Sequence, residues 1–597
     1  MANYPFIFVV LAIIAYGIAF RVYGKWYDRT VWKPDPKRTT PAHMYMDGVE
    51  YFPVSKYVLW GYQFKSIAAL GPILGPFVAL SFGWLPALIW IILGNFFIGW
   101  LQDYGAIMVS VRNEGRSFGP ISYELTGPKG RNTLLGFLLF YMIIISAVFI
   151  YLIATFWNIF PTTFVATLGI FATGILAGRL LYKYRINVVR VTILALALIV
   201  VSIFLGRLLP IPSNFLGSWT IAFWAVVVCG ILFAGSILPM PVFIQPVNYV
   251  SFFPTYLAII LILIGALLSP ITNISLVQAA FKGFYPDPNV GPLWPILFVA
   301  IACGAISGWH SLVGSSTTSK QLDIETDAHP VGAGSMLSEG LLALASVACY
   351  MVLTNDEMKV AAAAAGGVRN IGSWVYGAVK LTSAYFGGGE AVRNFLTTYF
   401  GVVLVIYALT VQALVTRFWR LISAEVFGQN ILGQKYPATF VGLLIPWIFA
   451  ITGSWINLWL YFGGANQLLA GLAIMLITIH LARVKSPSIY TLIPATFMIV
   501  TTLAALLWEI YDFTRAVLGY LGIEEFAKFG LKVAGPLAKP SPDAPYPYPT
   551  ISVLLNSVFI LVGVMLFLLG LRMAYYTYKA YFRFKAEPTP AMARESA

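Results

Sequence analysis

Residues 60–76, WGYQFKSIAALGPILGP, are apolar enough to lie in a membrane, yet they do not describe an uninterrupted spanning helix. Gly-Pro occurs at residues 71–72 and again at 75–76, and Lys65 lies just before these pairs. Proline removes a backbone N–H donor and disturbs the turn before it. Such backbone is tolerated at membrane depth only where protein buries it or where it lines a polar cavity. We therefore expect a discontinuous helix in which residues 66–75 line a transport site; the alternative is a kink that serves packing only.

The composition around this stretch is that of an integral membrane protein. Of 597 residues, 59% are hydrophobic and only 10% are charged, whereas soluble domains carry roughly 25% charged residues. The first twenty residues lack a basic segment and a small-residue cleavage site, so we expect no cleavable signal peptide. The three cysteines lie in apolar runs without metal-ligand spacing and are interpreted as small core residues.

Apolar runs long enough to span a membrane, about 17–25 residues each, predict about fifteen transmembrane helices. They fall at residues 5–22, 57–81, 84–109, 133–157, 162–181, 191–208, 219–238, 248–268, 293–313, 334–353, 394–415, 437–458, 461–482, 488–510 and 551–573. Lysine and arginine concentrate in alternate connections, which accounts for the net charge of +14 without nucleic acid. The positive-inside rule then predicts a multi-pass cell-membrane protein with its N-terminus outside and its C-terminus in the cytoplasm.

A second proline-rich break lies at residues 231–249, ILFAGSILPMPVFIQPVNY. Four intact spans separate it from the first break, and the two breaks enter the membrane from opposite sides. We therefore predict an all-α LeuT-type fold of 5+5 inverted repeats, at 57–208 and 209–415, with discontinuous first and sixth repeat helices. Residues 1–56 are expected to form an N-terminal span and a cytoplasmic loop. Residues 416–597 are expected to hold about four further spans, an external Pro-rich loop and a cytoplasmic tail.

Hydroxyl side chains gather at the end of the span at 293–313, the eighth helix of the predicted repeats. Ser315, Ser316, Thr317 and Thr318 follow one another there. Hydroxyl oxygens and unwound carbonyls suit a hard cation such as sodium. The cluster therefore predicts a substrate or alkali-cation site beside the first break, with Ser315 and Thr318 as cation ligands; helix-end capping is the alternative.

Four long stretches of the chain resemble the carbon starvation protein A (CstA) family of membrane transporters. They are residues 41–76, 101–119, 302–322 and 462–476. The resemblance implies the LeuT-type fold of the amino acid/polyamine/organocation superfamily. It also implies uptake of short peptides, or of pyruvate or another small carboxylate in close relatives, driven by a proton or sodium gradient.

The chain departs from the family pattern at several polar positions. It carries Tyr-Gln at residues 62–63, where many members have a His pair, and Val-Asn at residues 247–248, where many have Arg-Asp. Ala413 stands where many members have an acidic residue, and Lys65 replaces a small residue. These changes remove candidate titrating groups and add one cation.

Three ionisable residues inside apolar spans are candidates for function. The Lys65 ammonium either replaces a coupling cation or binds a substrate carboxylate; snorkelling to the inner interface is the structural alternative. A carboxylate inside a membrane needs a partner or a wet cavity, and we expect Lys65 to be the partner of Asp103. The pair would form either a charge relay or a structural ion pair that fixes helix packing. Histidine in general titrates near physiological pH, so we expect His310 to serve either proton coupling or an ordinary hydrogen bond.

The predicted substrate and ion site contains a polar or glycine residue from each of these stretches. Its members are Lys65, Ser66, Gly71, Gly75, Asp103, Gln245, Asn248, His310, Ser315, Ser316, Thr317 and Thr318. Scattered histidines without metal spacing argue against an enzyme, and broken-helix repeats favour a carrier over a channel. We expect no cofactor beyond a coupling H⁺ or Na⁺, with a peptide or pyruvate and the lipid bilayer as partners. The sequence leaves open the oligomeric state and the choice of substrate.

Overall fold

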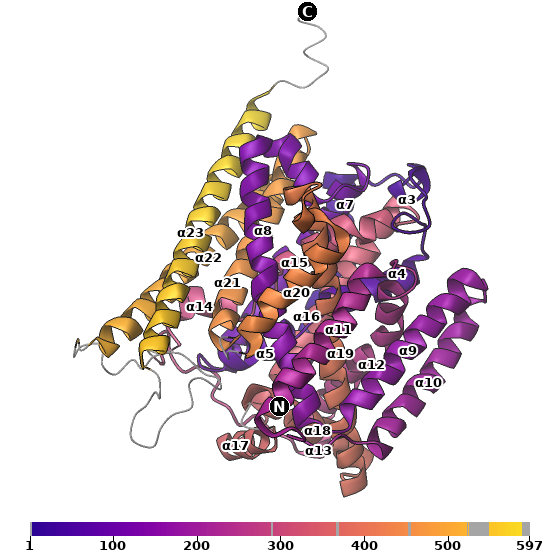
Figure 1. The fold of residues 1–597 in the computed structure, drawn as a ribbon, viewed down its shortest axis with the longest axis vertical. Helices are drawn as coiled ribbons and strands as arrows, with labels where there is room; N and C mark the ends of the chain where they lie inside the picture. The colour runs from indigo at the N-terminus through magenta and orange to yellow at the C-terminus, as the bar shows by residue number, and fades with distance from the viewer. Residues whose placement is uncertain are drawn as a thin grey trace, which may run out of the picture.

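The computed structural model describes residues 3–287, 290–365, 369–451, 455–521, 523 and 549–587. The regular structure in this part of the chain is helical, apart from an isolated parallel bridge between Val54 and Leu322. The helices stand side by side in one bundle, with α23 (Pro549–Ala586) at one edge and α9 (Thr163–Gly178) and α10 (Val188–Leu208) at the other (Figure 1). Most of the predicted external Pro-rich loop and the end of the tail lie outside the described residues.

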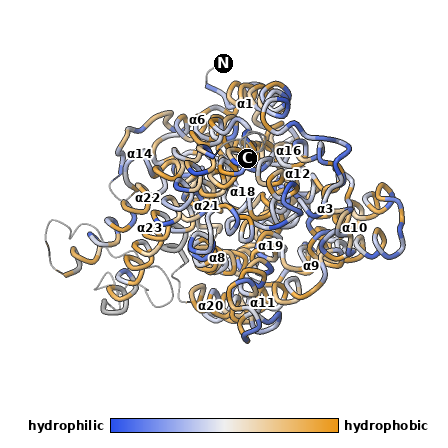
Figure 2. The backbone as a smooth tube through the Cα atoms, turned by 90° about the horizontal axis from the view of Figure 1, so that it is seen from above, coloured by the Kyte–Doolittle hydropathy of each residue, from blue (hydrophilic) through white to orange (hydrophobic). Residues whose placement is uncertain are grey.

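Within the described residues, twelve helices are long and apolar enough to cross a membrane. Besides α9, α10, α23 and the interrupted helices described below, this part of the chain contributes further long elements to the bundle. They are α1 (Phe6–Ile18) with its continuation to Trp32, α6 (Trp84–Gly94) with α7 (Trp100–Val111), α8 (Phe118–Ile159), α11 (Thr220–Ile237), α12 (Ile244–Leu267), α16 (Ala328–Met351), α18 (Arg369–Ser383), α19 (Glu390–Phe427), α20 (Lys435–Ile451), α21 (Trp455–Arg483) and α22 (Ile489–Tyr520). Helices suit a membrane because each satisfies its own backbone hydrogen bonds. Viewed from above, α10 stands at the edge, whereas α16, α18 and α21 lie in the interior (Figure 2). The chain is a multi-pass membrane protein.

The first discontinuous helix lies where the sequence predicts it. α4 (Lys56–Ile67) ends at Ile67. The extended backbone of the next residue, Ala68 (φ −66°, ψ 111°), interrupts the helix. α5 (Gly71–Ala79) then begins with Pro72 in its first turn, where a missing N–H costs nothing because that group has no helical partner. The predicted interruption within residues 66–75 is confirmed.

The second discontinuous helix is not where the sequence predicts it. α11 and α12 are each long enough to span a membrane alone, so Pro239 and Pro241 lie in the connection between two helices. The interrupted element is instead α14 (Leu293–Ala300) followed by α15 (Gly308–Ser316), with residues 301–307 between them. No proline occurs in these seven residues. The expectation of a break at 231–249 within one span is therefore corrected.

The two interruptions pack directly against each other at the centre of the bundle. A Cβ atom added at Gly71 would lie 2.5 Å from the Cys303 side chain, and one added at Gly75 would lie 2.3 Å from the Ala300 carbonyl oxygen. Small residues four apart let membrane helices approach to backbone contact. Glycine at these two positions therefore allows the broken end of α5 to lie on the broken end of α14.

Candidate transport site

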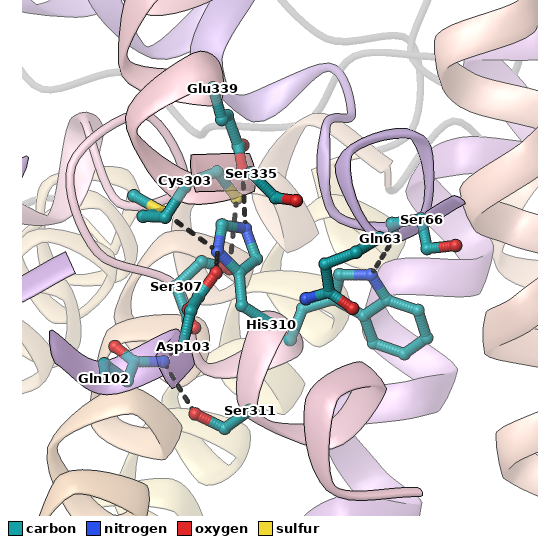
Figure 3. A network of polar contacts seen from close by, with 12 residues as sticks. Gln63, Ser66, Gln102, Asp103, Cys303, Ser307, His310, Ser311, Ser335 and Glu339 are labelled. Carbon is teal, nitrogen blue, oxygen red and sulfur yellow. Dashed lines mark hydrogen bonds and ion pairs between the residues drawn. The ribbon is translucent and has the colours of Figure 1, made fainter. Parts of the chain in front are cut away.

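His310 lies in α15 between carboxylates from two other helices. Its Nδ1 atom is 3.1 Å from Asp103 Oδ2 on α7, and its Nε2 atom is 2.9 Å from Glu339 Oε2 on α16. All three side chains are fully buried, and Figure 3 shows the imidazole ring between the two carboxylates. We refer to these residues as the Asp103–His310–Glu339 triad.

The charges of the triad do not balance by themselves. One imidazolium neutralises one carboxylate, so two ionised carboxylates leave a net negative charge that is costly to bury. Closely spaced ionisable groups of this kind take up and release protons as a unit. Asp103 Oδ1 and both carboxylate oxygens of Glu339 also accept no hydrogen bond from any described residue; the contact of Glu339 Oε2 with His310 Nε2 is an ion-pair distance without hydrogen-bond geometry. The triad therefore has both the charge and the vacant acceptors to hold an additional proton.

Lys65 lies near the end of α4, and its side chain is fully buried. Its ammonium donates to Thr410 Oγ1 on α19 at 2.7 Å and to the Ala68 carbonyl oxygen at 3.3 Å. The nitrogen also lies 4.6 Å from the centre of the Tyr407 ring. Asp103 pairs with His310 instead, so the expected Lys65–Asp103 pair is absent, and complete burial contradicts snorkelling.

The predicted hydroxyl cluster is buried, and its donors are used. Thr317 donates to the Val313 carbonyl oxygen at 2.8 Å, Ser316 donates to the Leu312 carbonyl oxygen, and Thr318 donates to Gln63 Oε1. Ser315 makes a long contact of 3.4 Å to the same Leu312 oxygen. Hydroxyls bonded one turn back are common in helices. A role of these residues in binding an ion stays a prediction.

The remaining predicted residues divide into two groups. Ser66, Gly71 and Gly75 lie at the α4–α5 interruption; the Ser66 carbonyl accepts from Trp309 Nε1 at 2.9 Å, and its hydroxyl has no described partner. Gln245 and Asn248 lie in α12 and bond elsewhere. Gln245 Oε1 accepts from Tyr182 at 2.6 Å, and Asn248 donates to the Ile244 carbonyl at 2.8 Å. The structure therefore gathers Lys65, Ser66, Gly71, Gly75, Asp103 and His310 around the interruptions. Gln245 Nε2 and Asn248 Oδ1 are also buried without described partners, and a role of these two residues in the site stays a prediction.

Polar residues that the sequence analysis did not place in the site hold α15 in position. Asn466 Oδ1 on α21 accepts from the Trp309 backbone N–H at 3.1 Å, in the first turn of α15. Gln102 on α7 donates to the Ser311 hydroxyl at 2.7 Å. These bonds fix the helix that carries His310. Glu339 was also missed, although a carboxylate inside an apolar span is itself a functional signal.

The comparisons with known proteins identify the family of the chain. The sequence pattern described as "Carbon starvation protein CstA" matches residues 4–375 and 359–505. The chain belongs to the CstA family. One relative in this family, "Peptide transporter CstA" of Campylobacter jejuni, is 28% identical over 558 residues, which is 83% of this chain and 79% of the relative.

Two further similarities are of different kinds. The "Pyruvate/proton symporter BtsT" of Escherichia coli K12 is 32% identical over 360 residues, 58% of this chain and 49% of that protein. Among solved structures, a manganese transporter from Eremococcus coleocola is 13% identical and covers 90% of this chain and 99% of that chain, with a TM-score of 0.39. We draw no argument from a structural likeness at that score.

A cavity of about 490 Å³ lies beside the last turns of α15. Its walls include Leu312, Ser315, Ser316, Arg116, Lys320 and Glu425. Beside it, Glu50 contacts Arg417 on α19 and lies 3.7 Å from Lys320. In this CstA-family protein, ion pairs thus hold the connection at residues 33–55 next to the cavity. The wall of that cavity includes Leu312, two residues after His310 in α15.

Proposed function

We propose that this protein is a proton-coupled secondary transporter that imports short peptides by alternating access. The observation that carries the proposal is the buried Asp103–His310–Glu339 triad beside two facing helix interruptions. Discontinuous helices form substrate and ion sites in many secondary transporters, and titratable side chains inside a membrane mark proton relays. The peptide transporters named CstA, to which the chain is similar over most of its length, support the substrate class.

The triad favours a proton over sodium as the coupling ion. A histidine between two carboxylates binds a proton without any change of coordination geometry. In the proposed cycle the triad takes a proton from outside together with substrate and releases it inside.

For the fold we propose a LeuT-type pair of inverted repeats with revised boundaries. The second repeat begins at α14–α15 and runs to α21, and the first runs from α4–α5 to α12 with α9 and α10 as an inserted hairpin. The helix contacts support this pairing. α12 packs on α4 as α21 packs on α15, and α16 packs on α4 as α7 packs on α15. The central α8 and α19, which pair in this scheme, pack on each other.

The substrate is expected to lie at the interruption between α4 and α5. Ser66 Oγ and Gln63 Nε2 are buried there without described partners, and the N-terminus of α5 offers a positive dipole to a carboxylate. Rocking of one repeat against the other would open this position toward the cavity beside Ser315 and Ser316. With the predicted topology, that cavity faces the cytoplasm and serves as the exit.

Pyruvate or another small carboxylate is the second candidate substrate. It is favoured by the 32% identity to a protein named as a pyruvate/proton symporter. Pyruvate presents the same carboxylate to the α5 N-terminus as a peptide does, without the remainder of the peptide. The two candidates share the coupling mechanism and differ only in the size and the amino group of the cargo.

The decisive experiment uses purified protein in liposomes. Labelled dipeptides, tripeptides and pyruvate are offered under an inward proton gradient and, separately, under an inward sodium gradient at equal pH. The proposal predicts saturable accumulation of one cargo class with the proton gradient and none with sodium alone. Accumulation driven by sodium alone, or saturable uptake of none of these cargoes, would overturn it.

A further inference from the structure

The partners of Lys65 are neutral. Its nitrogen contacts the Thr410 hydroxyl and the Ala68 carbonyl and lies over the face of the Tyr407 ring. No described carboxylate lies within ion-pair distance of it; the Glu339 carboxylate, which pairs with His310, interacts with it only electrostatically. A buried ammonium is thus surrounded by oxygen lone pairs and one π face.

These partners are the groups that hold a free monovalent cation in a protein. Carbonyl and hydroxyl oxygens coordinate hard cations, and an aromatic face attracts any cation placed over it. The Ala68 carbonyl belongs to the interruption itself, where α4 has ended and its last carbonyls carry the negative end of the helix dipole. The position therefore attracts positive charge before Lys65 is considered.

The contacts also place Lys65 between two elements that have to stay together. α4 ends at the interruption, and Thr410 and Tyr407 lie in the fully buried middle of α19. By bonding both, the ammonium ties the broken end of α4 to α19. A substrate carboxylate would have to displace the Thr410 or Ala68 bond, or share the remaining N–H, in order to reach it.

We propose that the Lys65 ammonium is a built-in cation, occupying a monovalent-cation site between the α4 interruption and α19. The protein then needs no bound sodium ion to hold these elements together, and Lys65 is a positioning residue rather than a ligand of the substrate. The inference deepens the proposed function by assigning the two kinds of ion separately: protons to the triad, and a fixed cation to Lys65.

Removal of the side chain should convert the site into one that accepts ions from solution. In Lys65→Ala the Thr410 hydroxyl, the Ala68 carbonyl and the Tyr407 ring are left without their cation. Purified full-length protein is melted in choline chloride and then in sodium, potassium, methylammonium or ethylammonium chloride. Ligands that bind only the folded state raise the melting temperature as their concentration rises.

We expect Lys65→Ala to melt below the wild type in choline chloride and to regain stability with at least one small cation. The wild type should show no such gain, because its site is already filled. Lys56→Ala is the matched control, since Lys56 lies on the same helix with a side chain that is 46% exposed; it should behave like the wild type. Adding Thr410→Val to Lys65→Ala should abolish the cation effect.

Two results would overturn the inference. One is a Lys65→Ala protein that no cation stabilises more than it stabilises the wild type. The other is a wild type that sodium stabilises as strongly as the variant. If Lys65→Ala cannot be purified, Lys65→Ser is tested in its place by the same comparison. Serine keeps a small oxygen ligand at the position.

The melting experiment separates this inference from the proposed function. It contains no substrate, so its outcome holds even if neither peptides nor pyruvate are transported. In liposomes, the two ideas together predict that Lys65→Ala loses about tenfold or more of its uptake and recovers it with the cation that restores the melting temperature. Recovery of melting without any uptake by the wild type would contradict only the proposed function.

Discussion

His310 Nε2 lies 2.9 Å from Glu339 Oε2, and both side chains are fully buried. This pair joins α15, which follows the second interruption, to α16, which packs on both α4 and α5. In the proposed cycle, this contact links the protonation state of one carboxylate to the position of the helix that carries the histidine. Four of the five predictions below concern this pair or the elements around it.

Glu339→Gln should abolish proton-driven accumulation while leaving exchange of labelled for unlabelled cargo. The amide keeps the shape of the side chain but cannot bind and release a proton. Without a group that carries the proton, the gradient no longer drives uptake, so accumulation should fall to the level that the wild type reaches without a proton gradient. Uptake and counterflow in liposomes measure the two activities; Glu390→Gln, an exposed residue at the start of α19, is the control. Undiminished accumulation by Glu339→Gln would contradict a role in coupling.

His310→Gln should remove the dependence of uptake on external pH. Wild-type uptake is expected to rise as the external pH falls, because the triad is loaded from that side. Without the imidazole, the two carboxylates lose the group that joins them, and the profile should become flat and low. Initial rates across a series of external pH values, at constant internal pH, test this. A variant whose pH profile keeps the wild-type shape would exclude His310 from coupling.

Gly75→Ala should destabilise the protein, because the new Cβ atom would lie 2.3 Å from the Ala300 carbonyl oxygen. Overpacking of this kind costs about 1–3 kcal/mol, and backbone cannot move aside as a side chain can. Gly136→Ala on α8 is the control, since nothing lies within 4 Å of its added Cβ atom. Thermal melting in detergent should show a lower midpoint for Gly75→Ala and an unchanged or higher one for the control. Equal midpoints would mean that the interruptions do not pack as described.

Glu50→Gln should loosen the connection at residues 33–55 and favour the state open to the adjacent cavity. The Arg417 guanidinium is only 5% exposed and would lose its carboxylate partner. In a background without native cysteines, Ser316→Cys should then react faster with a membrane-impermeant thiol reagent. The reagent is applied from each side in turn, which also tests the predicted sidedness. Faster labelling in Glu50→Gln would support the view that the Glu50–Arg417 ion pair keeps the cavity closed. An unchanged rate would refute it.

The helix α17 (Asn355–Ala364), in the predicted external connection, should lose stability in acid. Partial burial raises the pKa of Glu357, but bonds from Lys380 and from the Thr354 backbone outweigh this effect and leave the pKa below its ordinary value of about 4.5. A lowered folded-state pKa means that the stabilisation is complete above the unfolded value and is lost as the pH falls through the folded value. Hydrogen exchange of α17 should therefore speed up below about pH 4.5, after correction for intrinsic rates. Glu357→Gln should exchange faster at neutral pH and show little further change in acid.

The first interruption could be predicted from sequence because proline causes it, and proline is visible without a structure. The second could not, because residues 301–307 contain no proline and their irregular backbone accompanies close packing against α5. Proline at 239 and 241 misled the expectation, since proline is equally suited to a connection between spans.

Two of the three triad residues could be singled out from the sequence, but not their pairings. Asp103 and His310 were recognised as buried ionisable residues, but their contact depends on the rotation of α7 and α15 about their axes, which hydropathy does not give. Lys65 was expected to face Asp103 and instead faces Thr410 on α19. Glu339 is a lone carboxylate in the apolar run at 334–353, but the sequence does not show that it faces His310.

The contact of Gly71 and Gly75 with Cys303 and Ala300 has a mechanical consequence. Because Gly71 and Gly75 carry no side chain, α5 can turn against Cys303 and Ala300 at these two positions without a rotamer change on the glycine side. This contact can therefore serve as a pivot, and a small tilt there becomes a larger displacement at both ends of the interrupted helices. The glycine contacts between α5 and residues 300–303 would then set how far each end of the carrier opens.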